Sequence, residues 1–325
     1  MREFDIEKFV RRLGRFHVEQ RVNIQAYQAA DVFGRGLVHI HIENMMWLHF
    51  LLKRALQLAG AYRRGCRNTG RFVVRHNDIV LPALPAALDG MTLLHLSDLH
   101  ADFSATAMAA LIRAVDGLAW DACVWTGDYR GLTHGPWEDA AAELSRVRRA
   151  LHGPVFAVLG NHDPLELADA FEEMDVRLLL NERAAYERGG AHLWIAGVDD
   201  PHFYETDSIE KAVDGIPAGE PVVLLSHSPE LYRKAAYGGI DVMLCGHTHG
   251  GQFCLPGGFP VLANARVPPR MTRGAWRFRQ LQGYTSRGCG VSGVECRFNC
   301  PPEIVLHHLR RTPGCNPQGV TCPPR

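Results

Sequence analysis

The most constraining feature of this sequence is a set of polar groups that each follow a short apolar run. Runs of this kind, placed between glycine and proline residues, are typical of buried strands. They occupy residues 91–96, 122–125, 155–159, 222–225 and 242–245. Because the carboxyl ends of parallel strands meet at one edge of a sheet, where α/β folds bind ligands, we expect the polar groups to converge there.

These polar groups consist of residue types that coordinate metal ions. They are Asp98-Leu99-His100, Gly127-Asp128, Gly160-Asn161-His162-Asp163, His227 and Gly246-His247-Thr248-His249. Asp, His and Asn supply the oxygen and nitrogen donors that hold borderline divalent metals such as manganese, iron, zinc or nickel. A strand places residues i and i+2 on one face. We therefore expect the Asp-x-His pair and the His-x-His pair each to point to one site.

The number of donors favours two metal ions over one tetrahedral site. Asp128 has two carboxylate oxygens and is able to bridge two cations. A two-metal centre clamps a phosphoryl group and generates a hydroxide nucleophile at neutral pH. The donor set therefore predicts an enzyme that hydrolyses phosphoester bonds.

The same groups resemble the motifs of the calcineurin-like metallophosphoesterases. The similarity is to a bacterial branch that includes small phosphodiesterases, and it covers residues 80–310. The segments that carry it are LLHLSDLH (93–100), TGD (126–128), VLGNHD (158–163), GVDDPH (197–202), LLSHSPE (224–230), CGHTHGGQF (245–253) and TSRGCGVSGVECRFNCPPEI (285–304). The resemblance implies an α/β fold, a sandwich of two mixed β-sheets flanked by helices, with an N-terminal helical extension.

The resemblance also implies a role for each motif residue. The first metal would be held by Asp98, His100, Asp128 and His249, and the second by Asp128, Asn161, His227 and His247. His162 would contact the substrate phosphate, as a general acid or as a stabiliser of charge, and Asp163 would orient it. Arg130-Gly131 depart from the branch, which often has an apolar residue followed by an acid there. This departure predicts that the loop beside Asp128 is shaped for another substrate.

Three functions are compatible with these residues. The leading one is a dinuclear-metal-dependent phosphodiesterase that uses a metal-bridging hydroxide. One alternative is a pyrophosphatase of a nucleotide-activated lipid-linked sugar, of the UDP-diacylglucosamine type, at the membrane surface. It requires an apolar groove beside the metals, for which Trp47, Phe50 and Leu51 are candidate lining. The other alternative is a non-catalytic binding module on the same fold. Such a module would have lost some of the metal-binding residues, and none is lost here.

Composition divides the chain into three parts. We expect a helical N-terminal extension over residues 1–79, the metallophosphoesterase domain over residues 80–311 and an irregular tail over residues 312–325. Within the extension, residues 1–30 and 38–62 favour helices. Within the domain, helices are expected between strands over residues 105–118, 137–151 and 164–173, which argues for βα units.

The extension carries a second signal, because residues 44–77 contain seven basic residues and no acidic one. An apolar helix face with Trp47 and Phe50, followed by a basic cluster, resembles an interfacial membrane helix. The alternative is a helix packed on the core with a solvated basic end. The longest uncharged apolar stretch of this region, residues 44–52, is far below the ~20 residues that a membrane span requires.

Charge and cysteine content bear on partners and location. Lys+Arg equals Asp+Glu at 35 each, so no global field draws nucleic acid, and no nucleic-acid binding is expected. The spacing of Cys296/Cys300 and Cys315/Cys322 suggests metal or disulfide, but no zinc-ribbon pattern is complete. The N-terminus lacks the apolar stretch of a signal peptide. We therefore expect a cytoplasmic protein with reduced thiols. If the extension binds lipid, the protein should be peripheral on the inner face of the membrane. The sequence carries no signal for a particular oligomeric state.

Overall fold

The computed structural model describes residues 4–28 and 45–312 of the 325-residue chain, and two six-stranded sheets form its centre. The first sheet has the order β1 (Val73–Leu81), β12 (Glu303–Arg311), β2 (Thr92–Leu96), β3 (Ala122–Thr126), β4 (Val155–Val158) and β5 (Val176–Leu178). The second has the order β10 (Gly274–Phe278), β11 (Leu281–Thr285), β9 (Val242–Cys245), β8 (Val222–Leu225), β7 (Ala191–Gly197) and β6 (Glu182–Arg188).

Both sheets are mixed. In the first, β12 runs antiparallel to β2, and the other neighbours are parallel. In the second, β10 and β6 run antiparallel to β11 and β7, and the other neighbours are parallel. Apolar side chains from both sheets, among them Leu93, Val124, Val223 and Leu244, form one buried core. The predicted sandwich of two mixed sheets is therefore confirmed.

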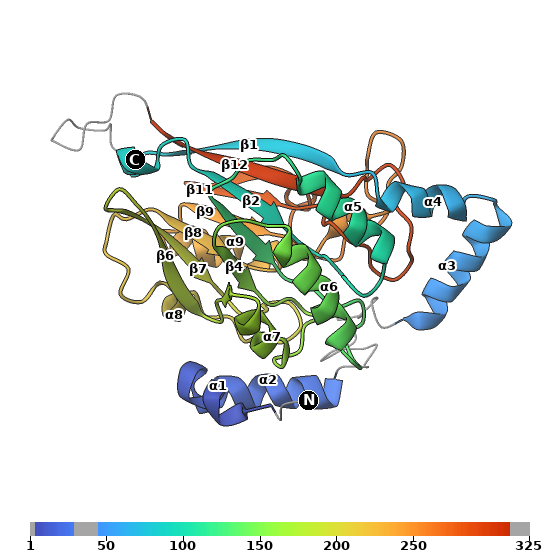
Figure 1. The fold of residues 1–325 in the computed structure, drawn as a ribbon, viewed down its shortest axis with the longest axis horizontal. Coiled ribbons are helices and arrows are strands. Elements are labelled where there is room, and N and C mark those ends of the chain that lie inside the picture. Colours follow the sequence, from blue (N-terminus) through green and yellow to red (C-terminus); the bar gives the residue numbers. More distant parts are fainter. Residues whose placement is uncertain (1–3, 29–44, 313–325) are drawn as a thin grey trace.

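Helices cover the outer face of each sheet (Figure 1). The helices on the first sheet are α5 (Ala105–Val115), α6 (Glu138–Arg149) and α7 (Leu167–Glu173), and those on the second are α8 (Ile209–Val213) and α9 (Tyr232–Tyr237). α5 begins where Ser104 Oγ accepts a hydrogen bond from the Ala107 N–H, which satisfies a free amide of the first turn. α7 begins later than expected, because residues 165–166 form a turn.

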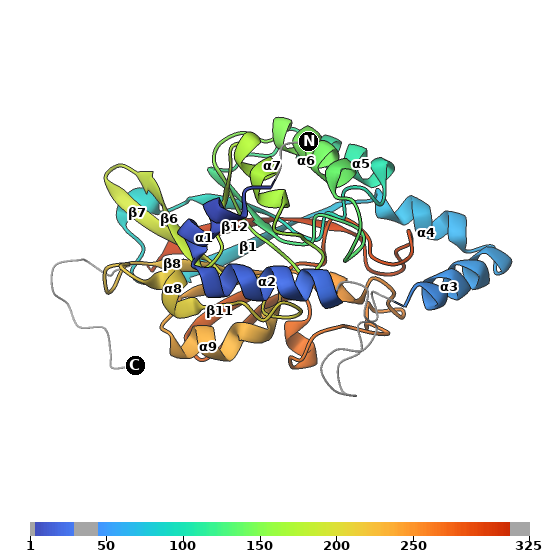
Figure 2. The ribbon, with the colours of Figure 1, turned by 90° about the horizontal axis from the view of Figure 1, so that it is seen from below.

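The first two helices, α1 (Ile6–Leu13) and α2 (Arg15–Gln28), pack on the domain. Phe9, Leu13 and Val18 are buried in the same apolar core as residues of α5 and α7. Figure 2 shows α2 running across the molecule between α7 on one side and α9 on the other. This part of the expected extension is therefore continuous with the core of the sandwich.

The next two helices, α3 (Met46–Leu58) and α4 (Tyr62–Thr69), project from one end of the domain (Figure 1). The helix expected over residues 38–62 is present as α3 in its described part but ends earlier, at Leu58, because Gly60, with φ of 67°, turns the chain before α4. Residues 38–44 of that expectation, and residues 313–325 of the expected tail, lie outside the described ranges. The expected boundary between residues 79 and 80 falls inside β1, which pairs with β12. Within residues 4–28 and 45–312, every helix is too short or too polar to span a bilayer.

Candidate metal centre

The five polar groups lie just beyond β2, β3, β4, β8 and β9, as the apolar runs predict. The strand geometry expected for the two spaced pairs is wrong, however. Asp98 and His100 follow β2 with φ of 50° and 39°, and His247 and His249 follow β9 with φ of 71° and 51°. Asp128 has the same left-handed conformation, with φ of 56°. Left-handed backbone, and not strand alternation, therefore aims these side chains at one place.

The first group of converging donors comprises Asp98, His100, Asp128 and His249, whose ligand atoms all lie within 4.8 Å of one another. Nε2 of His249 is 3.5 Å from Oδ1 of Asp98, and Nε2 of His100 is 3.8 Å from Oδ2 of Asp128. The two imidazole Nε2 atoms are 3.1 Å apart. All four side chains are buried. These are the residues expected around the first metal.

The second group comprises Asp128, His227 and His247, again with ligand atoms within 4.8 Å. Nε2 of His227 is 3.3 Å from Oδ2 of Asp128. The amide oxygen of Asn161 is 3.0 Å from this Nε2 and 3.0 Å from Nδ1 of His247. Asp128 is a member of both groups, so its carboxylate lies between two sets of donors.

Backbone carbonyl groups fix the orientation of three histidine rings. Nδ1 of His100 is 2.7 Å from the Arg130 carbonyl oxygen, and Nδ1 of His227 is 2.7 Å from the Thr126 carbonyl oxygen. Nδ1 of His162 is 3.0 Å from the carbonyl oxygen of Gly131. Because a carbonyl oxygen only accepts, each Nδ1 carries the proton, and in the neutral ring each Nε2 is left as a lone pair. This is the tautomer that a metal-binding histidine needs.

The charges of the site also fit divalent cations. Burial raises the pKa of Asp98, whereas at Asp128 the neighbouring His227, His162 and His100 outweigh burial and hold the pKa well below its usual value. Burial opposes the charged form of His227, but Asp128 raises the pKa of this ring to about 10, so this position favours a positive charge, which a bound metal would supply in place of the ring proton. Nδ1 of His247 faces Nε2 of His227 at 3.2 Å, and the Nε2 atoms of His100 and His249 face one another at 3.1 Å. Lone pairs that face one another in a buried site call for a cation between them.

Comparison with known proteins agrees with this geometry. The sequence profile of the calcineurin-like phosphoesterase family matches residues 91–251, the segment that contains both donor groups. Residues 91–251 form a calcineurin-like phosphoesterase domain. The chain therefore contains a metal-dependent phosphoesterase domain, as the sequence predicts.

Three curated relatives show the range of proteins that this domain resembles. The chain is 29% identical over 258 residues to the transmembrane protein with metallophosphoesterase domain of Bos taurus, covering 73% of this chain and 56% of that protein. It is 27% identical over 235 residues to phosphodiesterase YaeI of Escherichia coli, covering 67% and 81%. It is 25% identical over 290 residues to UDP-2,3-diacylglucosamine pyrophosphatase LpxG of Chlamydia trachomatis, covering 70% and 85%. The match spans little more than half of the bovine protein's length.

In this calcineurin-like domain, Asp163 connects two loops of the site through their backbones. Oδ2 of Asp163 accepts hydrogen bonds from the N–H groups of Asp128 and Gly160, at 2.8 and 2.7 Å. Its Oδ1 accepts one from the N–H of Tyr129, at 2.7 Å. Burial and the nearby Asp128 raise the pKa of Asp163 to about 6. The carboxylate thus clamps the loop after β3 to the loop after β4.

The departure at residues 130–131 has a structural role. Arg130 is buried, and its guanidinium donates to the carbonyl oxygens of His162, Gly135 and Thr133 at 2.9, 2.6 and 2.7 Å. The side chain therefore holds residues 133–135 against the loop that carries His162. The sequence flagged this position, but only the structure shows that the arginine faces inward.

Sequence reasoning missed a chain of hydrogen bonds that ends on Asp98. Ser97 Oγ donates to Asp98 Oδ2 at 2.6 Å, and Thr126 Oγ1 donates to Ser97 Oγ at 2.7 Å. Nε2 of His95 is 2.8 Å from Thr126 Oγ1, and Nδ1 of His95 is 3.2 Å from Nε2 of His307. Burial lowers the pKa of His95 to about 3, so this ring is neutral. His95 stands within an apolar run that predicts a buried strand, and its position there gave no sign of this role.

Two buried arginines were also missed. Arg297 is fully buried, and its Nη2 lies 3.3 Å from Nδ1 of His249. Arg21 of α2 is fully buried as well, and its Nη2 donates to the carbonyl oxygen of Asp163 at 2.8 Å. Both guanidiniums therefore support backbone or ring positions at the site. Arg21 lies in a polar helical segment that carries no signal of burial, whereas Arg297 lies in the segment 285–304 that carries the family resemblance, which could have drawn attention to it.

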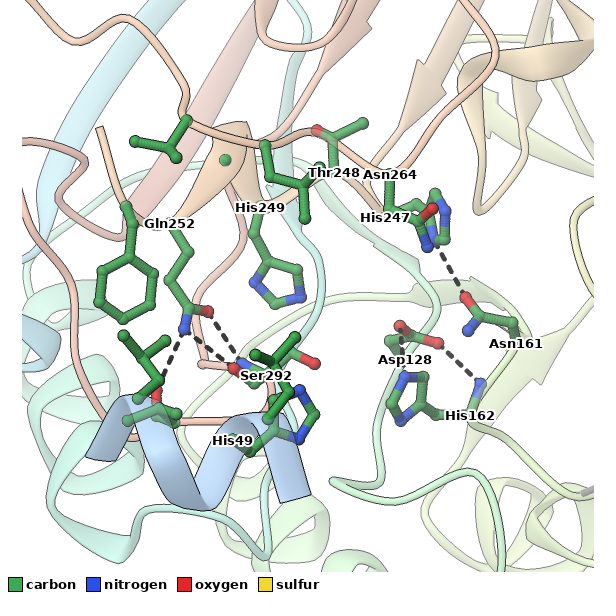
Figure 3. A pocket seen from close by; sticks show the side chains of 17 residues that line it. His49, Asp128, Asn161, His162, His247, Thr248, His249, Gln252, Asn264 and Ser292 are labelled. Carbon is green, nitrogen blue, oxygen red and sulfur yellow. Dashed lines mark hydrogen bonds and ion pairs between the residues drawn. The ribbon is translucent and has the colours of Figure 1, made fainter. Parts of the chain in front are cut away.

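A cavity of about 460 Å³ opens directly onto the donors. Asp128, Asn161 and His162 line one side, and Figure 3 shows His49 of α3 beside Ser292 on the other. Most of its remaining wall is apolar, formed by Leu48, Leu52, Phe253, Val261, Leu262 and Val294. The groove that the lipid alternative requires is thus present, but Leu48 and Leu52 line it in place of the expected Trp47, Phe50 and Leu51.

Cys296 and Cys300 do not form the pair that their spacing suggested. Sγ of Cys296 lies 3.9 Å from Sγ of Cys66 in α4, and Sγ of Cys300 lies 3.3 Å from the carbonyl oxygen of His249. The seven cysteines within the described ranges are free thiols. Cys315 and Cys322 lie outside the described residues.

Proposed function

We propose that this calcineurin-like phosphoesterase binds two divalent metal ions and hydrolyses phosphodiesters. The observation that supports it is the position of the Asp128 carboxylate between two groups of buried donors. One group is Asp98, His100 and His249, and the other is Asn161, His227 and His247. Bound metals supply Lewis acidity and activate water, and manganese, iron, zinc and nickel all suit this donor set.

We assign two further residues to the chemistry. Nε2 of His162 lies 3.9 Å from Oδ2 of Asp128, and this residue also lines the cavity. Its role is to protonate the leaving oxygen or to stabilise charge on it. Asp163 positions His162 through the backbone, because its carboxylate fixes the loops on either side of this ring. A diester needs room for a second substituent, which the cavity provides.

The test compares a diester with a monoester. Manganese-loaded protein should hydrolyse bis(p-nitrophenyl) phosphate with a higher kcat/KM than p-nitrophenyl phosphate. Asp128→Asn should abolish both activities, whereas Asp175→Asn, at a fully exposed carboxylate, should retain both. Protein that binds two equivalents of metal and hydrolyses neither ester would instead be a non-catalytic binding module.

A second candidate function is hydrolysis of the pyrophosphate of a nucleotide-activated lipid-linked sugar. The apolar wall of the cavity favours it, and the similarity to a UDP-2,3-diacylglucosamine pyrophosphatase points to the same class. Incubation with UDP-2,3-diacylglucosamine and mass spectrometry of the products tests it, with the deacylated compound as control. This candidate function implies a protein in the cytoplasm, peripheral on the inner face of the membrane. The proposed location is supported by the basic and apolar residues of the segment 44–77.

A further inference from the structure

Two exposed apolar segments, far apart in the sequence, border the same cavity. On α3, Trp47, Phe50 and Leu51 are each more than half exposed. In the loop after β9, the side chains that are more than half exposed are Leu255, Phe259, Val261 and Leu262. We call these seven residues the apolar rim. Large apolar side chains gathered at one place on a surface mark a binding region, whereas scattered ones do not.

The apolar rim is continuous with the wall of the cavity. Leu48 and Leu52 lie on the same helix as the α3 part of the rim, and both line the cavity. Val261 and Leu262 belong to the rim and to the lining at once. α3 is seated closely against the opposite wall, because a Cβ added at Gly293 would overlap the His49 ring. An apolar surface therefore leads from solvent to the metal donors.

The segments that carry the rim have only one sign of charge. Residues 45–77 and residues 242–294 contain no Asp or Glu, although the whole chain has 35 acidic and 35 basic residues. The exposed basic side chains near α3 are Lys53, Arg54, Arg63, Arg64 and Arg67, and those after the rim loop include Arg266 and Arg270. Glu295 directly follows the lining residue Val294, and Glu230 accepts a hydrogen bond from the Arg266 N–H, but basic side chains outnumber these two acids. The cavity mouth is thus an apolar surface beside mainly basic segments, which complements an anionic lipid surface.

We propose that the apolar rim docks on an anionic membrane and that the cavity takes the hydrocarbon chain of a phosphoester lipid. In this arrangement the chain lies along Leu52, Phe253 and Val294, and the headgroup phosphorus lies at the donors around Asp128. The choice of substrate rests on the proposed hydrolase function, whereas membrane docking does not. The two parts are therefore tested separately.

Vesicle sedimentation tests the docking. Full-length protein should pellet with phosphatidylcholine vesicles that contain phosphatidylglycerol, and not with phosphatidylcholine alone. Binding should weaken as salt rises, because charge is screened over about 8–10 Å at physiological ionic strength. The triple variants W47S/F50S/L51S and F259S/V261S/L262S should each bind at least about tenfold more weakly, since each removes apolar area that enters the interface.

Phe16→Ser is the matched control, because Phe16 is an exposed aromatic residue on α2, outside the rim. This variant should bind vesicles like the wild type. Wild-type protein that stays in the supernatant with anionic vesicles overturns the docking, and so do triple variants that pellet as the wild type does. If the rim is instead an interface between proteins, the wild type should stay in the supernatant with vesicles. The triple variants should then change how the protein sediments without vesicles.

A matched pair of diesters tests the substrate class. Hexadecyl p-nitrophenyl phosphate and ethyl p-nitrophenyl phosphate share their leaving group and differ only in chain length. The hexadecyl ester should have a kcat/KM about tenfold higher or more, because its chain is buried in the cavity. Leu52→Trp, which fills the cavity, should bring this ratio close to one. Leu56→Trp, on α3 outside the lining, should leave it unchanged.

The outcomes separate the two proposals. If neither ester is hydrolysed by metal-loaded protein, the proposed hydrolase function fails, and the substrate class fails with it. If both esters are hydrolysed equally well, the hydrolase function holds and the cavity does not bind the chain. A high ratio that survives Leu52→Trp also contradicts the assignment of the chain to this cavity.

Discussion

Nη1 of Arg21 lies 2.5 Å from Oδ1 of Asp199, and both side chains are completely buried. The same guanidinium stacks 3.9 Å from the Tyr204 ring and donates to the Asp163 carbonyl oxygen. We expect Arg21→Met to lower the free energy of unfolding by about 3–5 kcal/mol, because it removes the arginine partner of the buried Asp199 carboxylate. Urea denaturation measures this. Arg15→Met should change stability by less than about 1 kcal/mol, because Arg15 pairs with Glu19 at the surface.

The Arg21–Asp199 pair should also give stability a dependence on pH. Burial alone would raise the pKa of Asp199, but Arg21 and His17 outweigh it and hold the pKa below its usual value. The unfolded chain therefore binds a proton more readily than the folded one near pH 4. The stabilisation is present above this pH and is lost as the pH falls through the lower folded pKa. We expect the free energy of unfolding, measured by urea denaturation, to rise less steeply with pH between about pH 3 and pH 5 for Asp199→Asn than for the wild type.

Asp128→Asn should release one or both metals, because both donor groups include this carboxylate. The loss of metal affinity should be greater than the loss of about 10–100-fold that is typical of substitutions outside the ligand set. Elemental analysis after dialysis and calorimetric titration measure it. A variant that still binds two equivalents of metal with wild-type affinity would show that Asp128 is not shared.

His162→Ala should keep its metals and lose about 10²–10⁴-fold in kcat, as expected for a general acid. The loss should be smaller for diesters with a nitrophenol leaving group than for those with an alkyl alcohol, because a good leaving group needs less protonation. Equal losses on both kinds of ester would assign His162 to charge stabilisation alone. Loss of metal from the variant would assign it to the ligand set.

His95→Phe should weaken metal binding by about 10–100-fold, although His95 is not a donor of either group. The substitution removes the hydrogen bond to Thr126, whose hydroxyl orients Ser97 toward Asp98. Calorimetric titration with manganese measures the affinity, and the unfolding free energy of the metal-free variant reports any structural damage. His192→Phe, at a partly exposed strand position, is the control and should leave metal affinity unchanged.

The convergence of the site was predictable from sequence, because apolar runs locate strands and strand ends meet at a sheet edge. The backbone conformation that makes the two spaced pairs converge was not predictable. A spacing of two residues indicates a strand, yet Asp98 and His100 adopt left-handed backbone that neither residue type specifies. Long-range packing fixes these conformations, for example the bonds from the Asp98 N–H to the Gly127 carbonyl and from the His100 N–H to the Asp128 carbonyl.

The role of the N-terminal segment was harder to predict. Arg21 lies in a polar helix with no regular apolar face, so nothing local indicates that its side chain is buried. Its partner Asp199 is distant in sequence, and either residue alone is typical of a surface. For α3, the sequence identified an apolar helix but not which residues face the cavity, since that depends on how the helix is seated against the loop around Gly293.

The left-handed backbone at five donor positions has a consequence for how such a domain changes over evolution. Each of these residues adopts a conformation that costs an L-residue on the order of 1 kcal/mol and that glycine adopts freely. Replacing His100 or His249 by glycine therefore removes a donor and relieves backbone strain in one step. A lineage freed from selection for catalysis would gain robustness by losing donors at these positions first. Descendants that keep the sandwich but no longer turn over substrate are the expected product of such drift.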